Sequence, residues 1–226
     1  MNRVKRLLAV ILAMVTTVAA SAQDEPEYKL EIGAGAGLVS YVGDYNGNLT
    51  KGMQPWMMLM AKYRMDPRVA ASLNIGTGKI KGSTNNVKTW YPDGAYEFKH
   101  QITEVDVRLE YNFWPYGTGN EYRGARRFTP YIAAGLGATI YGGPEKGATM
   151  NLPIGAGVKY KIGKRLNLTA EWAMRITLSD KLDGSKDPYG IKSSGLFKNT
   201  DGYSVLQIAL TYDLWEKCKT CNNDRY

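Results

Sequence analysis

Residues 166–178 read LNLTAEWAMRITL, and apolar and polar side chains alternate strictly along this stretch. Alternation with a period of two places the two kinds of side chain on opposite faces of a β-strand. A tilted transmembrane strand needs about 9–11 residues, so this strand is long enough to cross a bilayer. One face carries Leu166, Leu168, Ala170, Trp172, Met174, Ile176 and Leu178, and the other carries Asn167, Thr169, Glu171, Ala173, Arg175 and Thr177.

Glu171 and Arg175 share the polar face of this strand, and lipid on that face would make their charges costly. We therefore predict that the polar face lines the inside of a closed barrel. A strand of a soluble β-sandwich, with its polar face in bulk water, is the alternative. The barrel is favoured because the rest of the chain repeats the same alternation in segments separated by turns and loops, as in outer-membrane barrels.

Further alternating segments fill the rest of the chain. With 166–178 they make eight strands, and bacterial single-chain barrels have an even number. The 25 Gly and 16 Tyr residues also favour a β-barrel. We predict an all-β fold, an eight-stranded antiparallel transmembrane outer-membrane β-barrel with N- and C-termini in the periplasm. The further strands are residues 28–40, 55–64, 69–79, 101–113, 128–141, 150–161 and 202–215.

The connections between these strands differ in length at the two ends of the barrel. Outer-membrane barrels have short periplasmic turns and longer extracellular loops. We assign the longer loops to the outside: 41–54, 80–100, 142–149 and 179–201. The tight turns 64–68 and 162–165 are then periplasmic. The connector 114–127 is long and basic for that side, so it is either a contact surface or a solvated turn.

The first 22 residues have the pattern of a secretory signal peptide, with a basic start, the apolar run 7–15 and a small-residue site at Ala22/Gln23. The run is shorter than the roughly 20 residues of a spanning helix, which disfavours an uncleaved anchor. Three basic residues of this segment belong to the formal net charge of +8, which leaves +5. We predict a signal peptide (1–22), a barrel (23–215) and a periplasmic tail (216–226) in a Gram-negative outer membrane.

Charged residues recur at inward positions of the predicted strands. An eight-stranded barrel is just wide enough inside for side chains to fill it, and buried charges must be paired. We therefore predict a neutral, filled ladder of ion pairs without a solute channel, with inward glycines leaving room for long side chains. The acids are Glu31, Glu104, Asp106, Glu110 and Glu171, and the bases are Lys29, Lys62, Arg108, Lys159 and Arg175.

Aromatic residues near the strand ends are expected to form the interfacial girdles of the barrel. They are Tyr28, Trp56, Tyr63, Tyr111, Trp114, Tyr141, Tyr160 and Trp215.

No pattern in the chain predicts catalysis or a bound small molecule. The single histidine, His100, shares a predicted loop region with Ser83 and Glu97, but no nucleophile motif surrounds them. The Gly-x-Gly repeats open no helix, so they predict no phosphate site. A charge of +5 without a basic helix or basic–aromatic repeat does not indicate nucleic-acid binding. We expect no enzyme activity, no cofactor and no small-molecule substrate.

Two cysteines, Cys218 and Cys221, lie in the predicted periplasmic tail, where disulfides persist. Their Cys-x-x-Cys spacing is half of a zinc site, and no second pair of ligands exists in the sequence. A local disulfide, a disulfide to a partner protein, free thiols and a shared metal all remain open.

Several motifs together resemble the PorG family, the outer-membrane barrel component of the type IX secretion system. They are SYVGD at 40–44, FTPYI at 128–132 with GLG at 135–137, and Trp172 followed by RITLSD at 175–180 and LD at 182–183. The resemblance covers essentially the whole mature chain. It departs at Lys181, where the family usually has an aromatic residue, and at Gly184, where it has a second acid.

The resemblance implies a non-catalytic barrel that anchors the periplasmic ring of the lipoprotein PorK and its partner PorN to the outer membrane. The expected contact surface is Trp114, Arg123, Arg126, Arg127, Cys218 and Cys221. Lipid and lipopolysaccharide are the other expected partners. The alternative is a small OmpA/OmpX-like structural barrel or adhesin that acts through extracellular loops 80–100 and 179–201.

Overall fold

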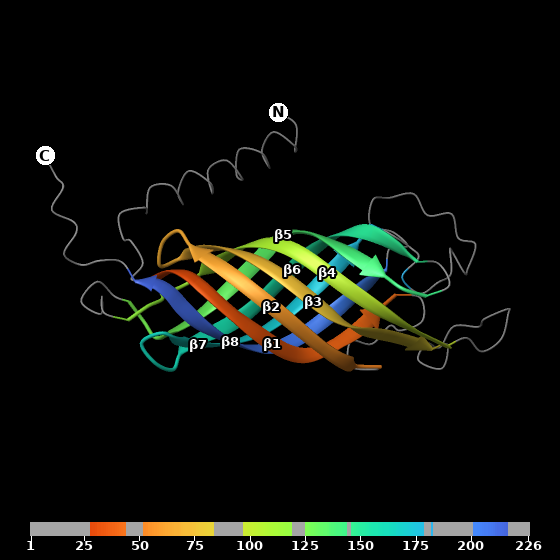
Figure 1. Ribbon diagram of the computed structural model, residues 1–226, viewed down its shortest axis with the longest axis horizontal. Coiled ribbons are helices and arrows are strands. Elements are labelled where there is room, and N and C mark those ends of the chain that lie inside the picture. The colour runs from red at the N-terminus through yellow and green to blue at the C-terminus, as the bar shows by residue number, and fades with distance from the viewer. Residues whose placement is uncertain are drawn as a thin grey trace, which may run out of the picture.

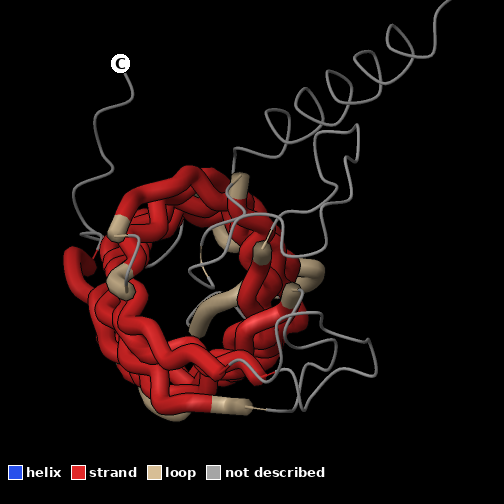
Figure 2. Tube along the Cα trace, turned by 90° about the vertical axis from the view of Figure 1, so that its right-hand side faces the viewer, coloured by secondary structure: helices blue, strands red, loops and turns tan. Residues whose placement is uncertain are grey.

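Eight antiparallel strands close into a barrel, and the last strand pairs with the first (Figures 1 and 2). The computed structural model describes residues 28–43, 52–83, 97–118, 125–143, 146–178, 182 and 201–216. Among these residues, no helix has the length and hydropathy of a membrane span. The strands are β1 Tyr28–Val42, β2 Gln54–Arg64, β3 Val69–Ser83, β4 Glu97–Asn112, β5 Phe128–Tyr141, β6 Gly147–Lys161, β7 Leu166–Thr177 and β8 Gly202–Glu216.

The predicted fold class is confirmed, and each predicted strand matches an observed one. The main difference lies at the outer ends of β3 and β4, because residues 80–83 and 97–100 continue the two strands and do not form a loop. Ile80 and Phe98 explain the extension, since both face inward and are buried. They continue the alternation that the shorter predicted strands cut off.

Both ends of the barrel chain, Tyr28 and Glu216, are cross-strand partners and lie at one end of the barrel. The turns after β2 and β6 lie at that end as well, at the left of Figure 1. In the first of these turns, Asp66 Oδ1 accepts hydrogen bonds from the backbone nitrogens of Arg68 and Val69, at 2.5 and 2.9 Å. The predicted tight turn at 64–68 is therefore held by the side chain of its own Asp66.

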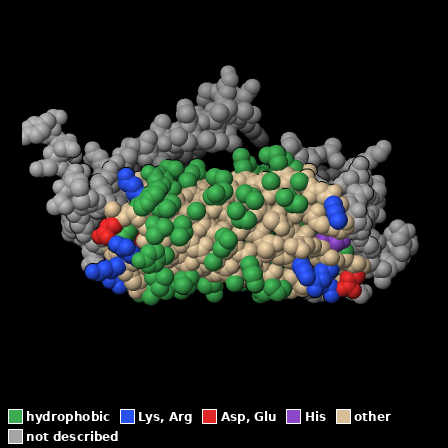
Figure 3. All heavy atoms as spheres, viewed as in Figure 1, with side chains coloured by type: hydrophobic (Ala, Val, Ile, Leu, Met, Phe, Trp, Pro, Cys, Tyr) green, Lys and Arg blue, Asp and Glu red, His purple; other side chains and the backbone are tan. Residues whose placement is uncertain are grey.

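Exposed apolar side chains cover the outer face of the barrel (green in Figure 3). Strand β2 shows the sorting most clearly. Met57 and Leu59 are 67% and 64% exposed, whereas Met58 and Met60 are 3% and 6% exposed. An apolar surface this extensive would aggregate in water, so it indicates contact with lipid. Closure of the barrel leaves no strand edge without a neighbouring strand, as a membrane interior requires.

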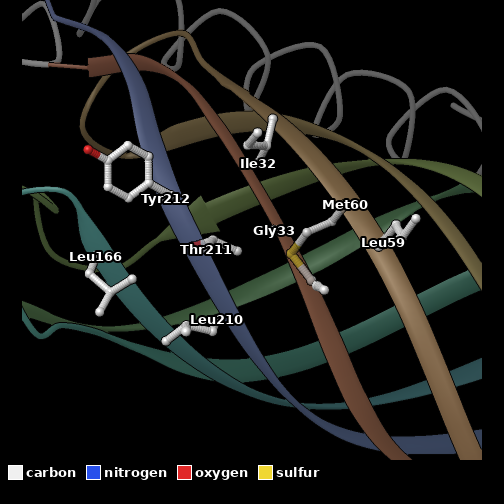
Figure 4. Close-up of a pocket in the computed structure, with 9 residues that line it drawn as sticks. Ile32, Gly33, Leu59, Met60, Leu166, Leu210, Thr211 and Tyr212 are labelled. Carbon is white, nitrogen blue, oxygen red and sulfur yellow. The ribbon is translucent and has the colours of Figure 1, made fainter.

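Small residues of β1 leave shallow grooves in this apolar face. One of about 520 Å³ runs beside Ala34, between Ile32 and Leu59 on one side and Leu210 and Tyr212 on the other (Figure 4). Its walls come from β1, β2, β7 and β8, and they are almost entirely apolar. The groove therefore belongs to the lipid-facing surface.

The predicted aromatic girdles are only partly correct. Tyr63, Tyr111, Trp114, Tyr160 and Trp215 are exposed at the barrel surface as expected. Tyr28, Trp56 and Tyr141 are instead buried, at 4%, 1% and 5% exposure. For Trp56 the reason is parity, since it neighbours the outward Met57 and must face inward.

Inward glycines allow the strands and lumen side chains to approach closely. A Cβ atom on Gly135 would lie 2.7 Å from the Cα of Arg108, and one on Gly76 would lie 2.1 Å from the Trp56 ring. On β1, a Cβ on Gly37 would lie 2.1 Å from the backbone oxygen of Leu206. A Cβ on Gly35 would meet nothing nearer than the Cβ of Ala209, at 3.1 Å.

Gly37→Ala should lower the free energy of unfolding by about 2 kcal/mol, because the added methyl overlaps a backbone atom that cannot move away. Gly35→Ala, on the same face of the same strand, should lower it by less than about 1 kcal/mol. Reversible urea unfolding in lipid vesicles measures both. Equal losses for the two variants would contradict the close approach at Gly37.

Candidate functional site

The lumen contains a set of buried charges contributed by six of the strands. All nine residues predicted for the ion-pair network face inward and are buried: Glu31, Lys62, Glu104, Asp106, Arg108, Glu110, Lys159, Glu171 and Arg175. The structure adds Arg64, Lys161 and Asp213, so six carboxylates face six cations within the strands. Lys29, also expected inside, is only partly buried.

The layer nearest the chain ends is centred on Arg64. Its guanidinium lies 2.6 Å from a Glu31 oxygen and 2.9 Å from an Asp213 oxygen. Lys161 forms an ion pair with the other Asp213 oxygen. The Asn167 side chain donates a hydrogen bond to Asp213 at 2.9 Å and accepts one from Lys161 at 3.2 Å. Two acids and two bases therefore neutralise one another there.

The next layer holds one acid between two lysines. Glu110 lies 3.1 Å from the Lys62 ammonium and 2.6 Å from the Lys159 ammonium. Lys159 also donates a hydrogen bond to Asn112 at 3.0 Å, and it lies 4.4 Å from the centre of the Tyr131 ring. Carboxylate, amide and ring face together compensate the two buried cations.

Arg108 and Arg175 organise the two layers beyond. Arg108 lies 2.7 Å from Glu171 and 2.9 Å from Asp106. Arg175 lies 3.1 Å from Glu104. Neighbouring tyrosines and amides donate further hydrogen bonds: Tyr131 to Glu171, Tyr203 to Glu104, Gln207 to Glu171 and Asn74 to Asp106.

The outer mouth of the lumen is closed by an apolar cluster. Leu182, from the connection between β7 and β8, is fully buried among aromatic residues that include Tyr41 and Phe98. Its backbone nitrogen donates to Asp201 at 3.0 Å, and its carbonyl oxygen lies 3.1 Å from His100 Nδ1. The side chains of Asp201 and His100 thus hold the apolar Leu182 in place at the outer mouth of the lumen.

His100, which the sequence placed in a predicted loop region, is therefore a buried structural residue of β4. Its ring lies 5.1 Å from the Phe98 ring. Glu97 faces outward from the same strand and is exposed, so it does not share a site with His100. Ser83 pairs with Glu97 across β3 and β4. In the part of the chain that the structure describes, no His, Cys, Asp and Glu group is arranged to hold a metal.

The described residues of the connector between β4 and β5 fold onto the periplasmic mouth. Tyr116 is 3% exposed, and its hydroxyl donates to Asn167 at 2.9 Å. The Arg64 guanidinium lies 5.2 Å from the centre of its ring. Burial raises the pKa of Tyr116, so the phenol stays a neutral donor. Backbone hydrogen bonds join Tyr116 to Pro67 and Gly117 to Arg126. The described part of the connector is therefore not a simple solvated turn.

Three of the predicted contact residues lie together on the outside of this connector. Arg126 stacks over the Trp114 ring at 5.0 Å, and the rings of Trp114 and Phe128 are 5.8 Å apart. Thr129 holds the Trp114 backbone through hydrogen bonds to its nitrogen and oxygen, at 3.0 and 3.1 Å. Arg127 is exposed beside them. We call Trp114, Arg126, Arg127 and Phe128 the periplasmic platform. Arg123, Cys218 and Cys221 lie outside the described residues.

A family model described as "Domain of unknown function (DUF6089)" matches residues 5–223. The chain belongs to the DUF6089 family. No curated protein matches its sequence. The DUF6089 barrel is similar in fold to the crystal structure of Neisserial surface protein A, with a TM-score of 0.53 at 12% identity over 82% of this chain and 97% of that chain.

Two other outer-membrane proteins also match. OprG from Pseudomonas aeruginosa has a TM-score of 0.46 at 12% identity, over 85% of the DUF6089 chain and 98% of its own. Ail of Yersinia pestis, in complex with the heparin analogue sucrose octasulfate, has a TM-score of 0.45 at 10% identity, over 84% and 99%. At 10–12% sequence identity, the similarity to these proteins is evidence of a similar fold only.

The sequence contained evidence for all three buried charges that the predicted network left out. Arg64, Lys161 and Asp213 each lie an even number of residues from another inward residue of their strand, so alternation places them inside. All three lie near strand ends, and the predicted network did not include them. Tyr116 had no such indication, since it lies beyond β4.

Glu110→Gln should lower the free energy of unfolding of the DUF6089 barrel by about 3 kcal/mol or more, because it leaves two buried lysines without a counter-charge. Urea unfolding in lipid vesicles measures the change. Glu216→Gln is the control, since the exposed Arg165–Glu216 pair should contribute nothing measurable. A Glu110→Gln barrel as stable as the control would contradict the role of Glu110 as the shared counter-ion.

Proposed function

We propose that this protein is a non-catalytic outer-membrane barrel that anchors the periplasmic ring of the type IX protein secretion system. The partners would be lipoproteins like PorK and PorN, and the contact would be the periplasmic platform. A signal peptide cleaved near Ala22/Gln23 would deliver the chain to the membrane.

The observation that carries this proposal is that the residues of the periplasmic platform are held by specific contacts. A solvated turn would have exposed backbone and mobile side chains, whereas Trp114 and Arg126 are stacked and Tyr116 is locked into the lumen. Trp and Arg side chains are among the residues most often found at the energetic centre of protein interfaces. Little side-chain entropy would be lost when a partner binds them.

The filled lumen supports the same proposal. Inward charges such as Arg175 and Glu104 are 0% and 1% exposed, so the described residues leave water little access to them. A barrel filled in this way suits attachment better than solute transport. Its rigid interior would hold the platform at a fixed depth relative to the membrane.

The competing function is that of an OmpA/OmpX-like structural barrel or adhesin. The observation in its favour is that β3 and β4 extend past the apolar belt on the outer side (lower right in Figure 1). Shortening the outer segments 84–96 and 183–200 separates the two functions. A secretion defect in those variants, with normal secretion in platform variants, would favour the outer surface over the anchor.

Arg126→Ala should reduce recovery of the ring lipoproteins with the barrel about tenfold or more, because a stacked interface arginine contributes about 2 kcal/mol. The measurement is affinity purification from mildly solubilised membranes, with the ring subunits quantified by immunoblot. Arg165→Ala is a matched control, since Arg165 lies 5.3 Å from the Tyr28 ring at the same end of the barrel. Equal recovery with both variants would refute the platform as the contact.

A second experiment tests the cysteine tail. If Cys218 or Cys221 forms a disulfide with the ring, non-reducing electrophoresis of native membranes should show a higher-mass adduct. Cys218→Ser and Cys221→Ser identify which thiol is used. Absence of any adduct in the wild type would exclude a covalent link, without affecting the test of Arg126.

A further inference from the structure

A basic patch lies on the outside of the barrel where β3 and β4 rise beyond the apolar belt. The outward positions of β3 run from Ile75 through Thr77 to Lys79 and Lys81, and those of β4 run from Val105 to Lys99. Figure 3 shows Lys and Arg side chains gathered near this end of the barrel, at the lower right beside an acidic group. The patch consists of Lys79, Lys81 and Lys99.

The register of the two strands concentrates like charge. Lys81 and Lys99 are direct cross-strand partners, and both face outward. Like charges placed opposite one another on a sheet repel and are destabilising. Glu97 lies 2.5 Å from Lys81 and compensates one charge, which leaves two uncompensated among these four residues. An anion between the strands would relieve the remaining repulsion.

The height of the patch matches a lipid headgroup. Ile75 and Val105 are exposed cross-strand partners, and they are the last apolar pair below the patch. Lys79 follows Ile75 by four residues, about 13 Å along the strand and roughly 10 Å along the membrane normal for a strand tilt of about 40°. That distance carries the ammonium groups from acyl chains to the headgroup region.

The surface below the patch fits an acyl chain. A groove of about 780 Å³ begins at Ile75, Thr77 and Thr103 and continues over Met57 and Ala36. The Thr77 and Thr103 hydroxyls lie 3.3 Å apart at its upper edge, between the lysines and the apolar surface. A charged head above and an apolar groove below are the two parts of an anionic lipid site.

We propose that Lys79, Lys81 and Lys99 bind the phosphate of lipid A in the outer leaflet, with an acyl chain in the groove beneath. The ammonium groups act as compact charges on a phosphate, and no base or nucleophile is involved. The site depends on the barrel orientation described above and is independent of ring attachment.

The test is binding of phosphorylated lipid A, supplied in mixed detergent micelles without divalent cations, to the full-length folded barrel. Lys79→Gln, Lys81→Gln and Lys99→Gln combined should weaken binding about tenfold or more, at about 1 kcal/mol for each charge near a lipid surface. Glu97→Gln should strengthen binding, because it frees Lys81. Arginine at all three positions should keep the wild-type affinity within threefold.

Three controls make the outcome decisive. Heat-modifiable electrophoretic mobility establishes that each variant is folded. Removing three cations at the periplasmic end that lie outside the periplasmic platform (Lys29→Gln, Lys164→Gln and Arg165→Gln) should leave lipid A binding unchanged. Dephosphorylated lipid A should bind weakly to wild type, and millimolar inorganic phosphate should not compete. Equal binding of lipid A by wild type and the triple glutamine variant, or loss of binding only in the periplasmic variant, would overturn the proposal.

Discussion

A charge inside an eight-stranded barrel has almost no water to solvate it, so it must find an opposite charge across the lumen. Each layer of this barrel meets that requirement in its own way. Arg64 bridges two acids, Glu110 is shared by two lysines, and Arg108 contacts two acids. Removing one member leaves a partner uncompensated, which costs far more than an exposed ion pair contributes.

The charges in the lumen also determine which face of the charged strands points inward. A one-residue slip in register would move charges such as Glu110 and Arg108 into lipid and the outward leucines into the lumen. Buried ion pairs are weak evidence for stability in themselves. Here they make the wrong register costly, and the inward glycines let bulky partners such as Trp56 and Arg108 fit.

Alternation alone was enough to predict the number of strands and the inward face of the nine network charges, because a period of two separates the lipid face from the lumen face. It did not place Tyr28, Trp56 and Tyr141, which were expected in the girdles and are buried. It could not predict that Tyr116 returns to the lumen, since that depends on tertiary contacts with Arg64 and Asn167. The burial of Leu182 at the outer mouth could not be predicted for the same reason, because Leu182 is held by Asp201 and His100 from other parts of the chain.

In the two proposals made above, the two ends of the barrel contact different neighbours. At the periplasmic mouth the described residues of the connector present Trp114 and Arg126, and at the other end β3 and β4 present lysines beyond the apolar belt. Between the two ends, the described side chains fill the lumen of the barrel.

Planar-bilayer recording of the purified wild-type barrel at neutral pH tests that filled interior most directly. With the charges paired across the lumen and Tyr116 and Leu182 at its mouths, insertion should produce no steady current at moderate voltage. A stable ohmic conductance that follows the amount of folded barrel would show continuous water through the lumen, and it would contradict an interior held together by mutual neutralisation.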